Sequence, residues 1–380
     1  METRIFRSQT DLPLRMANES SISLPAPIPD GTAKRVFVLV DSRLLLAALL
    51  TSIGYYLGSQ LGFTLTFQPH PVSVLWPPNS ILLAALLLTP PRAWTILLLA
   101  ALPAHIIVQL QSHIPVPMMF CYFISNSCEA LIGAVCIRYL VRGPVRFNSL
   151  RTTAIFCIFG ALAGPFLSSF LDAGFVKLNH WGTGQYWEIW QIRFFSNILT
   201  ALTFAPAILV WFARPVPRQM PFKRWREACL LFILLLGLCY AALYHEVPPA
   251  DPVLYCGLVL LLLWAALRLG ARGTLSATLV ITFLTIWSAA HGHGPFTTDT
   301  PEENARSIQV FLIVMAIPFL FLTAGVEERS TADDRFVKAF HANPDAAVIT
   351  RLSDGTFLDV NEQWLAMFGY ARHEVIGRLS

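Results

Sequence analysis

Long apolar runs recur along almost the whole chain, and they constrain its fold more than any other feature. A helix that crosses the hydrocarbon core of a bilayer needs about 20 mostly apolar residues. About ten segments approach this pattern, at 44–67, 72–90, 93–111, 117–139, 152–175, 192–212, 228–244, 252–267, 273–290 and 307–326. The short 252–267 and the proline-interrupted 72–90 fit it least well. The sequence therefore predicts an all-α polytopic membrane bundle.

Basic residues alternate between the loops of this bundle. Lys and Arg accumulate in short cytoplasmic loops of membrane proteins. One alternate set of loops carries twelve of them, namely Arg92, Arg138, Arg142, Arg146, Arg151, Arg214, Arg218, Lys223, Arg224, Arg226, Arg268 and Arg272. The other set carries three, namely Lys177, Arg193 and Arg306. We therefore expect about ten spans with both termini in the cytoplasm.

Composition excludes several classes of soluble protein. Hydrophobic residues make up 55% of the 380 residues and charged residues 13%, about half of what a globular domain carries. The formal charge of +4 is scattered between apolar segments, so we expect a lipid bilayer and no nucleic acid as partner. All seven cysteines lie in apolar stretches without a Cys-x-x-Cys pair, which argues against a disulfide or metal framework. The polar residues 1–35 read as a disordered cytoplasmic arm.

Ionisable residues inside the predicted spans are candidate site residues, because burying them in a bilayer is costly. Asn126 and Glu129 share one face of the fourth span and are expected to point into the bundle. They could form a ligand or proton site, or hydrogen-bond neighbouring helices, which is common in bundles. Asp172 and Arg193, near the outer ends of adjacent spans, could pair for a structural purpose.

The second span contains Trp76-Pro77-Pro78-Asn79. Proline suits the first turn of a helix and is unfavourable further along, so a helix should begin at Pro77. Its free N–H groups would lie slightly below the outer surface and could hold an anionic ligand group. The alternative is an interfacial helix start with Trp76 as its membrane anchor.

Histidines gather in the loops predicted to be outside, at His70, His113, His180, His245, His291 and His293. Histidine titrates near neutral pH and is the commonest metal ligand. A periplasmic sensor of pH or divalent metal is one interpretation, with His291 and His293 as its most local metal pair. The alternative is that histidine is simply tolerated where Lys and Arg are depleted.

The last fifty residues have the composition of a soluble domain. Residues 327–342 continue from the last span and are predicted to be helical. Strands are expected at 346–350 and 356–360 around the turn Ser353-Asp354-Gly355, a hairpin signal. Asn361 can cap a helix that carries Trp364, and Gly369 can end it.

Several short motifs in this tail together resemble the opening half of a PAS domain. They are Phe340-His341-Ala342-Asn343-Pro344-Asp345-Ala346, Asp354-Gly355, Val360-Asn361, Gly369-Tyr370 and Glu374-Val375-Ile376-Gly377. The resemblance implies an incomplete α/β domain at 343–380 that follows a signalling helix at 327–342. Only two of the five strands of a PAS sheet are expected here, which points to a fragment or an interrupted gene.

The bundle resembles the membrane-associated sensor domain of the first type (MASE1). The resemblance rests on Trp76-Pro77-Pro78, Ser125-Asn126-Ser127-Cys128-Glu129-Ala130-Leu131, Ala205-Pro206, Trp264-Ala265-Ala266-Leu267-Arg268-Leu269-Gly270 and Gly294-Pro295-Phe296. It implies a sensor domain over 36–326, an input module of bacterial sensor histidine kinases and cyclic-di-GMP enzymes. That family often has Gly-Asp where this chain has Ser196-Asn197. The ligand-site candidates are Trp76, Asn79, Asn126, Glu129, Arg193 and Asn197.

No nucleotide-binding glycine motif, cyclase signature or nucleophile elbow is present, and no catalytic residue or cofactor is identified. The leading hypothesis is the input region of a homodimeric sensor histidine kinase in the bacterial inner membrane, answering an unidentified stimulus. A diguanylate cyclase or phosphodiesterase input is one alternative. A secondary transporter is another, although only one broken span is evident where paired ones are usual.

Overall fold

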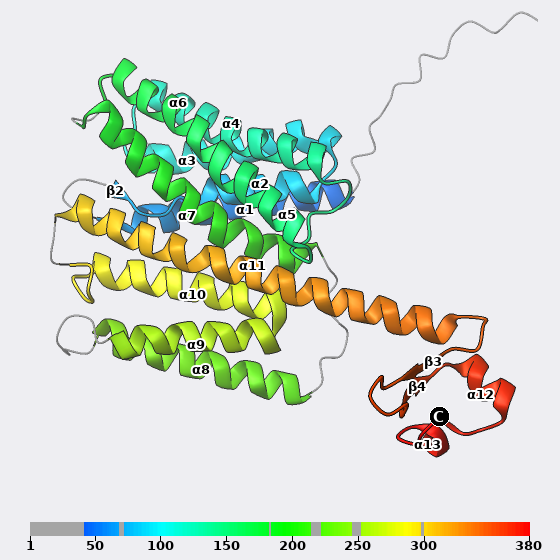
Figure 1. Cartoon of the computed structure of the whole chain (residues 1–380). Coiled ribbons are helices and arrows are strands. Elements are labelled where there is room, and N and C mark those ends of the chain that lie inside the picture. Colours follow the sequence, from blue (N-terminus) through cyan, green and yellow to red (C-terminus); the bar gives the residue numbers. More distant parts are fainter. Residues whose placement is uncertain (1–41, 68–71, 182–183, 214–221, 245–251, 298–299) are drawn as a thin grey trace, which may run out of the picture. The chain divides into compact units, whose positions relative to one another are not determined.

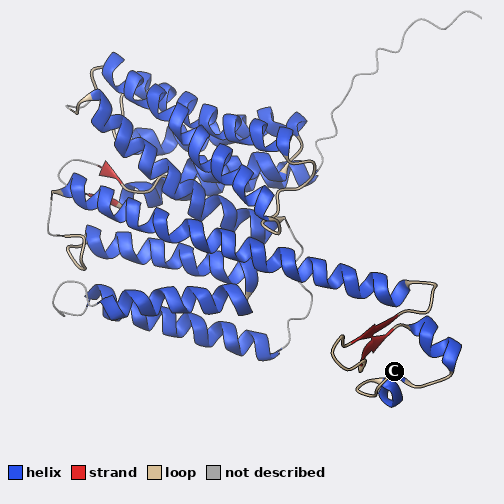
Figure 2. Ribbon diagram, in the orientation of Figure 1, coloured by secondary structure: helices blue, strands red, loops and turns tan. Residues whose placement is uncertain are grey.

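The computed structural model describes residues 42–67, 72–181, 184–213, 222–244, 252–297 and 300–380, and the arm at 1–35 lies outside them. The described chain is dominated by helices, with two small two-stranded sheets (Figures 1 and 2). The helices of the bundle are α1 (Ser42–Thr64), α2 (Pro77–Leu88), α3 (Trp94–Gln111), α4 (Val116–Leu140), α5 (Leu150–Ile155), α6 (Gly164–Leu178), α7 (Tyr186–Phe212), α8 (Phe222–Tyr244), α9 (Pro252–Arg268), α10 (Gly270–Ala290) and α11 (Pro301–Ala342), with a 3-10 turn η1 (Pro91–Ala93) before α3.

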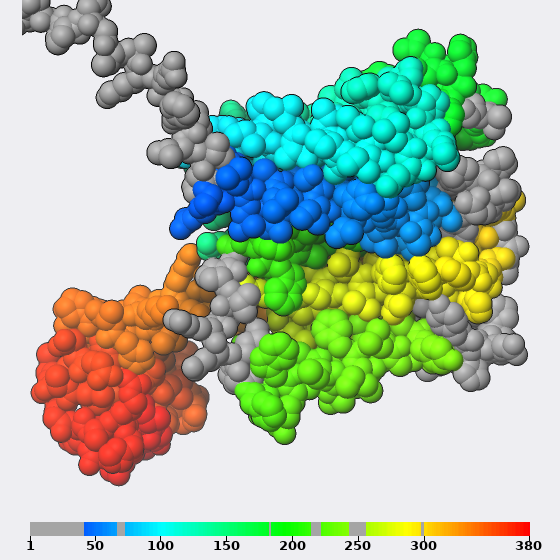
Figure 3. Space-filling view, turned by 180° about the vertical axis from the view of Figure 1, so that it is seen from behind, coloured from blue at the N-terminus to red at the C-terminus, as the bar shows by residue number. Residues whose placement is uncertain are grey.

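These helices confirm the predicted bundle, and they include every span expected from the sequence. In the described residues, eight helical segments are long and apolar enough to cross a membrane. The segments that fitted the pattern least well, α2 and α9, are indeed the shorter ones. Helix α1, blue in Figure 3, lies at the surface of the bundle, and its Leu45, Leu49 and Leu57 are more than half exposed. Such exposed leucines suit contact with lipid tails.

Helix α7 occupies the centre of the bundle. Two thirds of its apolar window (67%) is buried, the largest share among the candidate spans. It packs against α2 and α6 on one side and against α10 and α11 on the other. Two apolar cores form beside it, one built mainly from residues of α2, α3, α4 and α7, and the other mainly from residues of α8, α9, α10 and α11. Helix α7 therefore connects the first half of the bundle with the helices that precede the soluble tail.

Helix α2 is a 12-residue helix that begins at Pro77, as predicted. At 1.5 Å per residue it is about 18 Å long, too short to cross a bilayer core of about 30 Å alone. An extended segment precedes it, starting from a hairpin of β1 (Thr66–Phe67) and β2 (Val72–Ser73). Non-helical backbone at membrane depth is tolerated where protein surrounds it. Val74, Leu75 and Trp76 are accordingly buried.

Both ends of α2 are bound by other helices. At its start, the Trp76 backbone N–H donates to Thr200 Oγ1 of α7 at 2.9 Å. At its end, Arg138 Nη2 of α4 donates to the carbonyls of Leu87 and Thr89 at 2.6 and 2.9 Å. Basic side chains often satisfy the last carbonyls of a helix in this way. A short helix is thus stabilised inside the bundle without spanning it.

The fifth predicted span is irregular in its middle. Helix α5 continues into a π-helical stretch, η2 (Phe156–Ala163), and then into α6, which has Pro165 in its first turn. Proline lacks an N–H and its ring collides with the carbonyl four residues earlier, and the wider π turn relieves both problems. At this point α4 approaches the π-helical stretch closely. A Cβ added to Gly133 of α4 would lie only 3.3 Å from Gly160 Cα. Small residues permit this approach.

The soluble tail forms the expected hairpin and helices. Strand β3 (Val348–Thr350) pairs antiparallel with β4 (Phe357–Val360), and α12 (Glu362–Phe368) and α13 (Arg372–Val375) follow. Asn361 caps α12 by accepting from Trp364 N at 3.0 Å, and Gly369 ends it at a φ of 74°. The positive φ explains glycine at that position.

Candidate functional site

A group of buried polar side chains lies inside the bundle around Glu129. We call Asn79, Glu129, Ser168 and Asn197 the Glu129 cluster. Its members come from α2, α4, α6 and α7, and each is at most 5% exposed. Ser168 Oγ and Asn197 Nδ2 both donate to Glu129 Oε2, at 2.6 and 2.7 Å. Asn79 of α2 also interacts electrostatically with this carboxylate.

The cluster lies well below the ends of its helices. Glu129 is thirteen residues from the start of α4 and Asn197 eleven from the start of α7, so both are about 15–20 Å along their helices. Glycine at position 164 lets α6 approach α4 closely at this depth. A Cβ added there would lie only 3.1 Å from the Glu129 carbonyl oxygen. The carboxylate thus lies near mid-membrane depth, with hydrogen-bond donors from neighbouring helices.

A second set of contacts leads from the cluster helix α4 to α1 and α3. We call Asn126, Tyr55 and His105 the Tyr55 chain. Asn126 Nδ2 donates to the Tyr55 hydroxyl at 2.9 Å, and this hydroxyl lies 3.0 Å from His105 Nδ1. His105 Nε2 lies 2.9 Å from the Met119 carbonyl oxygen.

The Met119 carbonyl determines the direction of this chain. A carbonyl only accepts, so His105 Nε2 carries the proton. In the neutral ring Nδ1 is then an acceptor, and the Tyr55 hydroxyl donates to it. Each polar group in the Tyr55 chain therefore has one defined role, and the chain holds three helices in a fixed mutual rotation.

Further toward the predicted outer end, charged groups are also buried. Asp172 lies one helical turn beyond Ser168 on α6 and is 2% exposed. Arg193 of α7 donates to the Tyr122 hydroxyl at 3.0 Å, and its guanidinium lies 4.9 Å from the centre of that ring. Asp172 and Arg193 interact electrostatically. In the described residues no direct ion pair joins them, so the pair expected from the sequence is not formed by direct contact.

The structure brings three of the six predicted ligand-site residues together. Asn79, Glu129 and Asn197 form one cluster, whereas Asn126 turns to Tyr55 and Arg193 to Tyr122. Trp76 is only 7% exposed and packs edge-on against Phe63, with ring centroids 5.3 Å apart. Its expected role as an anchor at the membrane surface is therefore corrected, because the ring is enclosed by protein.

Sequence reasoning did not single out Tyr55, His105 or Ser168. Each of them is a polar side chain in an apolar span, and this alone could have marked it as a candidate. Which residue it contacts depends on how the helices are rotated, and the sequence does not show that. Tyr55 has a neighbour, Tyr56, with the same side chain, and only the first is fully buried.

The outer histidines do not form a metal centre in the residues that the structure describes, where no group of three potential ligands occurs. His291 and His293 are exposed, and their Nδ1 atoms donate to the carbonyls of Trp287 and His291. His70 and His245 lie outside the described residues. A metal-binding role of His291 and His293 stays an untested interpretation of the sequence.

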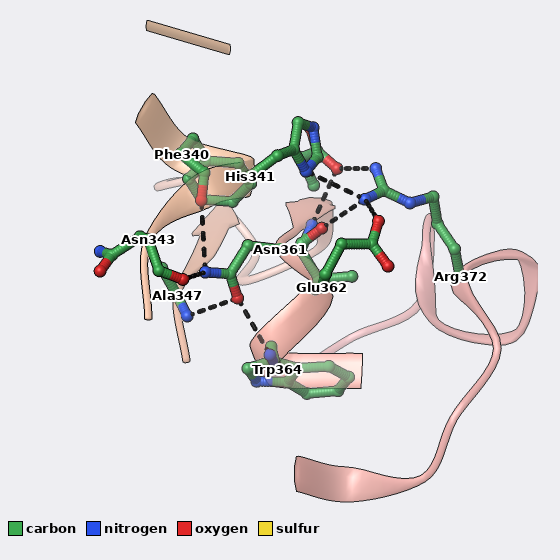
Figure 4. Close-up of polar contacts among 10 residues, drawn as sticks. Phe340, His341, Asn343, Ala347, Asn361, Glu362, Trp364 and Arg372 are labelled. Carbon is green, nitrogen blue, oxygen red and sulfur yellow. Dashed lines mark hydrogen bonds and ion pairs between the residues drawn. The ribbon is translucent and has the colours of Figure 1, made fainter. Parts of the chain in front are cut away.

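The junction between α11 and the tail is the second polar centre of the chain (Figure 4). Asn361 is fully buried, and its Oδ1 accepts from Ala347 N at 2.9 Å as well as from the capped helix. Its Nδ2 lies 3.3 Å from Phe340 O and 2.8 Å from Asp345 O. One side chain thus joins the end of α11, the segment that leads into β3, and the start of α12.

Arg372 adds a charged contact to this junction. Its Nη1 donates to Asp359 Oδ1 at 2.6 Å, and its Nη2 donates to Val360 O at 2.8 Å and to His341 Nδ1 at 3.2 Å (Figure 4). His341 is the penultimate residue of α11. The last turn of α11 is therefore held to the tail by side chains from β4 and α13.

A multi-span bundle with a buried polar cluster, connected by one helix to a small α/β unit, defines an integral membrane protein with an additional C-terminal module. Comparison with family models gives its identity: residues 44–330 match MASE1, and residues 334–380 match a PAS domain. The first match covers most of the chain, so the chain belongs to the MASE1 family. No curated protein and no solved structure matches it. The protein is a multi-pass membrane signalling input region.

Proposed function

We propose that the chain is the sensory input region of a receptor in the bacterial inner membrane, with both termini in the cytoplasm. A stimulus in the membrane or periplasm changes helix packing around the Glu129 cluster, and α11 transmits the change to the PAS module. The observation that carries this proposal is the continuity of α11, which runs without a break from Pro301 to Ala342.

Helix α11 has two different environments along its length. Its first part is packed in the bundle, where Ile308, Leu312 and Leu320 are at most 1% exposed. Beyond residue 328 most of its side chains are exposed. At 1.5 Å per residue its 42 residues extend about 63 Å, roughly twice the thickness of a bilayer core. A helix of this kind can carry rotation or translation from the membrane to the tail.

Contacts connect the Glu129 cluster to α11. Asn79 of the cluster lies in the first turn of α2. Three residues before that helix begins, the Val74 carbonyl accepts from Gln309 Nε2 of α11 at 3.1 Å, and Gln309 is 2% exposed. Any change that moves the start of α2 therefore acts on α11 through a buried hydrogen bond. A ligand shifts such a system only through different interactions with its two states.

The relay is tested by changing the phase of α11 between the membrane and the tail. Two residues inserted after Thr331 rotate the following helix by about 200°, whereas seven residues rotate it by only about −20°. We expect the two-residue insertion to abolish or invert stimulus-dependent output and the seven-residue insertion to preserve it. Undiminished signalling with both insertions would show that α11 does not act as a rigid helix.

For the output we propose a histidine kinase, by analogy with the family alone. The test is to express the chain together with the coding sequence that follows residue 380 and to assay it in membranes. ATP-dependent phosphorylation of a histidine supports the kinase. Formation or hydrolysis of cyclic di-GMP supports the alternative output.

A kinase also requires a homodimer, and we propose that the exposed part of α11 contributes to it. Phe336 and Val337 are 59% and 51% exposed on this helix. Cysteines introduced singly at these two positions are expected to cross-link in membranes, whereas a cysteine at the exposed Lys338, on the opposite face of the helix, is expected to cross-link less. Equal, low yields at all three positions would contradict this interface.

A transporter is the second candidate, because α2 begins inside the bundle as the broken helices of transporters do. Accumulation of a solute in proteoliposomes that contain the chain would support it. Ligand-dependent conformational change without flux supports the receptor.

A further inference from the structure

The charges buried around Glu129 do not balance. Glu129 and Asp172 are two carboxylates at most 5% exposed, and within the described residues the guanidinium that acts on Asp172 is that of Arg193. Buried charges in proteins are normally paired, because an unpaired one loses its hydration without compensation. With both carboxylates ionised, this part of the bundle is therefore short of one positive charge.

Unpaired oxygen atoms lie in the same region. Asn79 Oδ1 and Asp172 Oδ1 have no hydrogen-bond partner, and neither does Ser196 Oγ, next to Asn197. Each of these residues is 2% exposed. Amide and carboxylate oxygens are acceptors only, so further acceptors cannot satisfy them. They need a donor or a cation, and the Asn79 side chain is already placed at the Glu129 carboxylate.

The neighbouring side chains do not supply the missing charge. The titratable or charged groups that face the two carboxylates from the packed helices are Tyr55 of α1, His105 of α3 by way of Tyr55, Tyr122 of α4 and Arg193 of α7. His105 donates from Nε2 to a carbonyl and accepts at Nδ1 from Tyr55, so its ring is neutral in this arrangement. The tyrosines are neutral hydroxyls, and Arg193 is already counted.

We propose that the Glu129 cluster binds one small monovalent cation, with the Glu129 carboxylate and the free oxygen of Asn79 as its ligands. The positive charge is either a bound proton or an alkali metal ion such as Na⁺, since both offer one charge to hard oxygen atoms. A divalent ion would overcompensate the deficit. The site deepens the proposed function, because it names the class of ligand that would act on α2 and through it on α11.

The site lies in the part of the bundle best placed to transmit occupancy. Asn79 is in the first turn of α2, and Asn197 is one turn before Thr200, which holds the Trp76 N–H. A cation drawn between Glu129 and Asn79 fixes the start of α2 against α4 and α7. Without it, the carboxylate and the amide oxygen have no shared counter-charge, and that start is held less firmly.

Thermal unfolding of the purified chain in detergent tests this inference, with Na⁺ or the proton as the probe. One series replaces choline chloride by NaCl at constant ionic strength and pH 8.5, and a second lowers the pH in choline chloride. A ligand at one hundred times its dissociation constant stabilises by about 2.7 kcal/mol, which for a chain of 380 residues corresponds to a rise in Tm of about 3 °C. A rise with NaCl identifies the metal ion, and a rise only at lower pH identifies the proton.

Variants show whether the response comes from this site. Glu129→Gln keeps the shape of the side chain and removes the deficit, so its Tm should be high and insensitive to both series. Glu302→Gln is the matched control, because Glu302 lies in the first turn of α11 outside the cluster, and it should respond like the unaltered chain. If Glu129→Gln does not fold, Asp172→Asn replaces it, since it removes the other carboxylate and should also lose the response.

Two outcomes overturn the inference. One is an unaltered chain that responds to neither cation, and the other is a carboxylate variant that responds as strongly as the Glu302→Gln control. Because unfolding is measured without any output, either outcome leaves the α11 relay to its own insertion test. Conversely, failure of the relay does not affect the cation measurement.

Discussion

The side chain of Asn361 is expected to hold the junction between α11 and the PAS module, and removing it gives the sharpest test of that role. In Asn361→Ala, two backbone N–H groups lose their acceptor and the carbonyls of Phe340 and Asp345 lose their donor. A cap removed in this way costs about 1 kcal/mol, and each further hydrogen bond about 0.5–1.5 kcal/mol. Because the residue is fully buried, we expect a local destabilisation of about 3 kcal/mol.

Hydrogen exchange measured by mass spectrometry on the full chain in detergent reports this loss locally. A change of about 3 kcal/mol in the free energy of opening accelerates exchange about 100-fold in peptides that contain the amides of Ala347 and Trp364. Asn343→Ala is the matched control, since Asn343 Oδ1 accepts only from Asp345 N, at 3.1 Å. Exchange in Asn361→Ala no faster than in this control would refute the view that one asparagine holds the junction.

Further substitutions test other parts of the structure. Gly164→Val should separate α4 from α6 and cost about 1–3 kcal/mol, whereas Gly174→Ala, which meets no atom within 4 Å, should leave Tm almost unchanged in the same thermal unfolding assay. Thr200→Val leaves the buried Trp76 N–H without an acceptor, so it should lower the free energy of unfolding by about 1–3 kcal/mol and lower Tm accordingly. The control Thr203→Val should cost less, because that hydroxyl binds only carbonyls of its own helix. The Thr356 N–H holds the pKa of Asp354 below its ordinary value. The ionised carboxylate therefore stabilises the turn at a pH above the ordinary pKa, and this contribution is lost as the pH falls through the lowered pKa. Hydrogen exchange of the hairpin should show this acid sensitivity, and Asp354→Asn should abolish it.

The sequence was sufficient to predict features that depend on local chemistry. The spans follow from apolar length, and Pro77 sets the start of α2 because proline has no N–H to lose there. In the tail, the cap by Asn361 and the end of α12 at Gly369 were likewise predicted from single residue types. Each of these depends on a few neighbouring residues and not on how distant helices meet.

Features that depend on helix rotation could not be predicted. A buried polar residue indicates that a partner exists but not which helix provides it, so the bonds of Glu129 to Ser168 and Asn197 required the structure. Trp76 shows the same limit, because a tryptophan near the end of a span suits the membrane surface until an adjacent helix covers it. The orientation of the bundle in the membrane still rests on the distribution of Lys and Arg and stays a prediction.

The π-helical stretch η2 also fixes the angular position of everything that follows it in α6. A π turn accommodates one residue more than an α turn, and one residue corresponds to about 100° of rotation around an α-helix. Without the stretch at Phe156–Ala163, Ser168 and Asp172 would therefore face away from α4. The length of that segment, more than the identity of its apolar side chains, decides which residues of α6 reach the centre of the bundle.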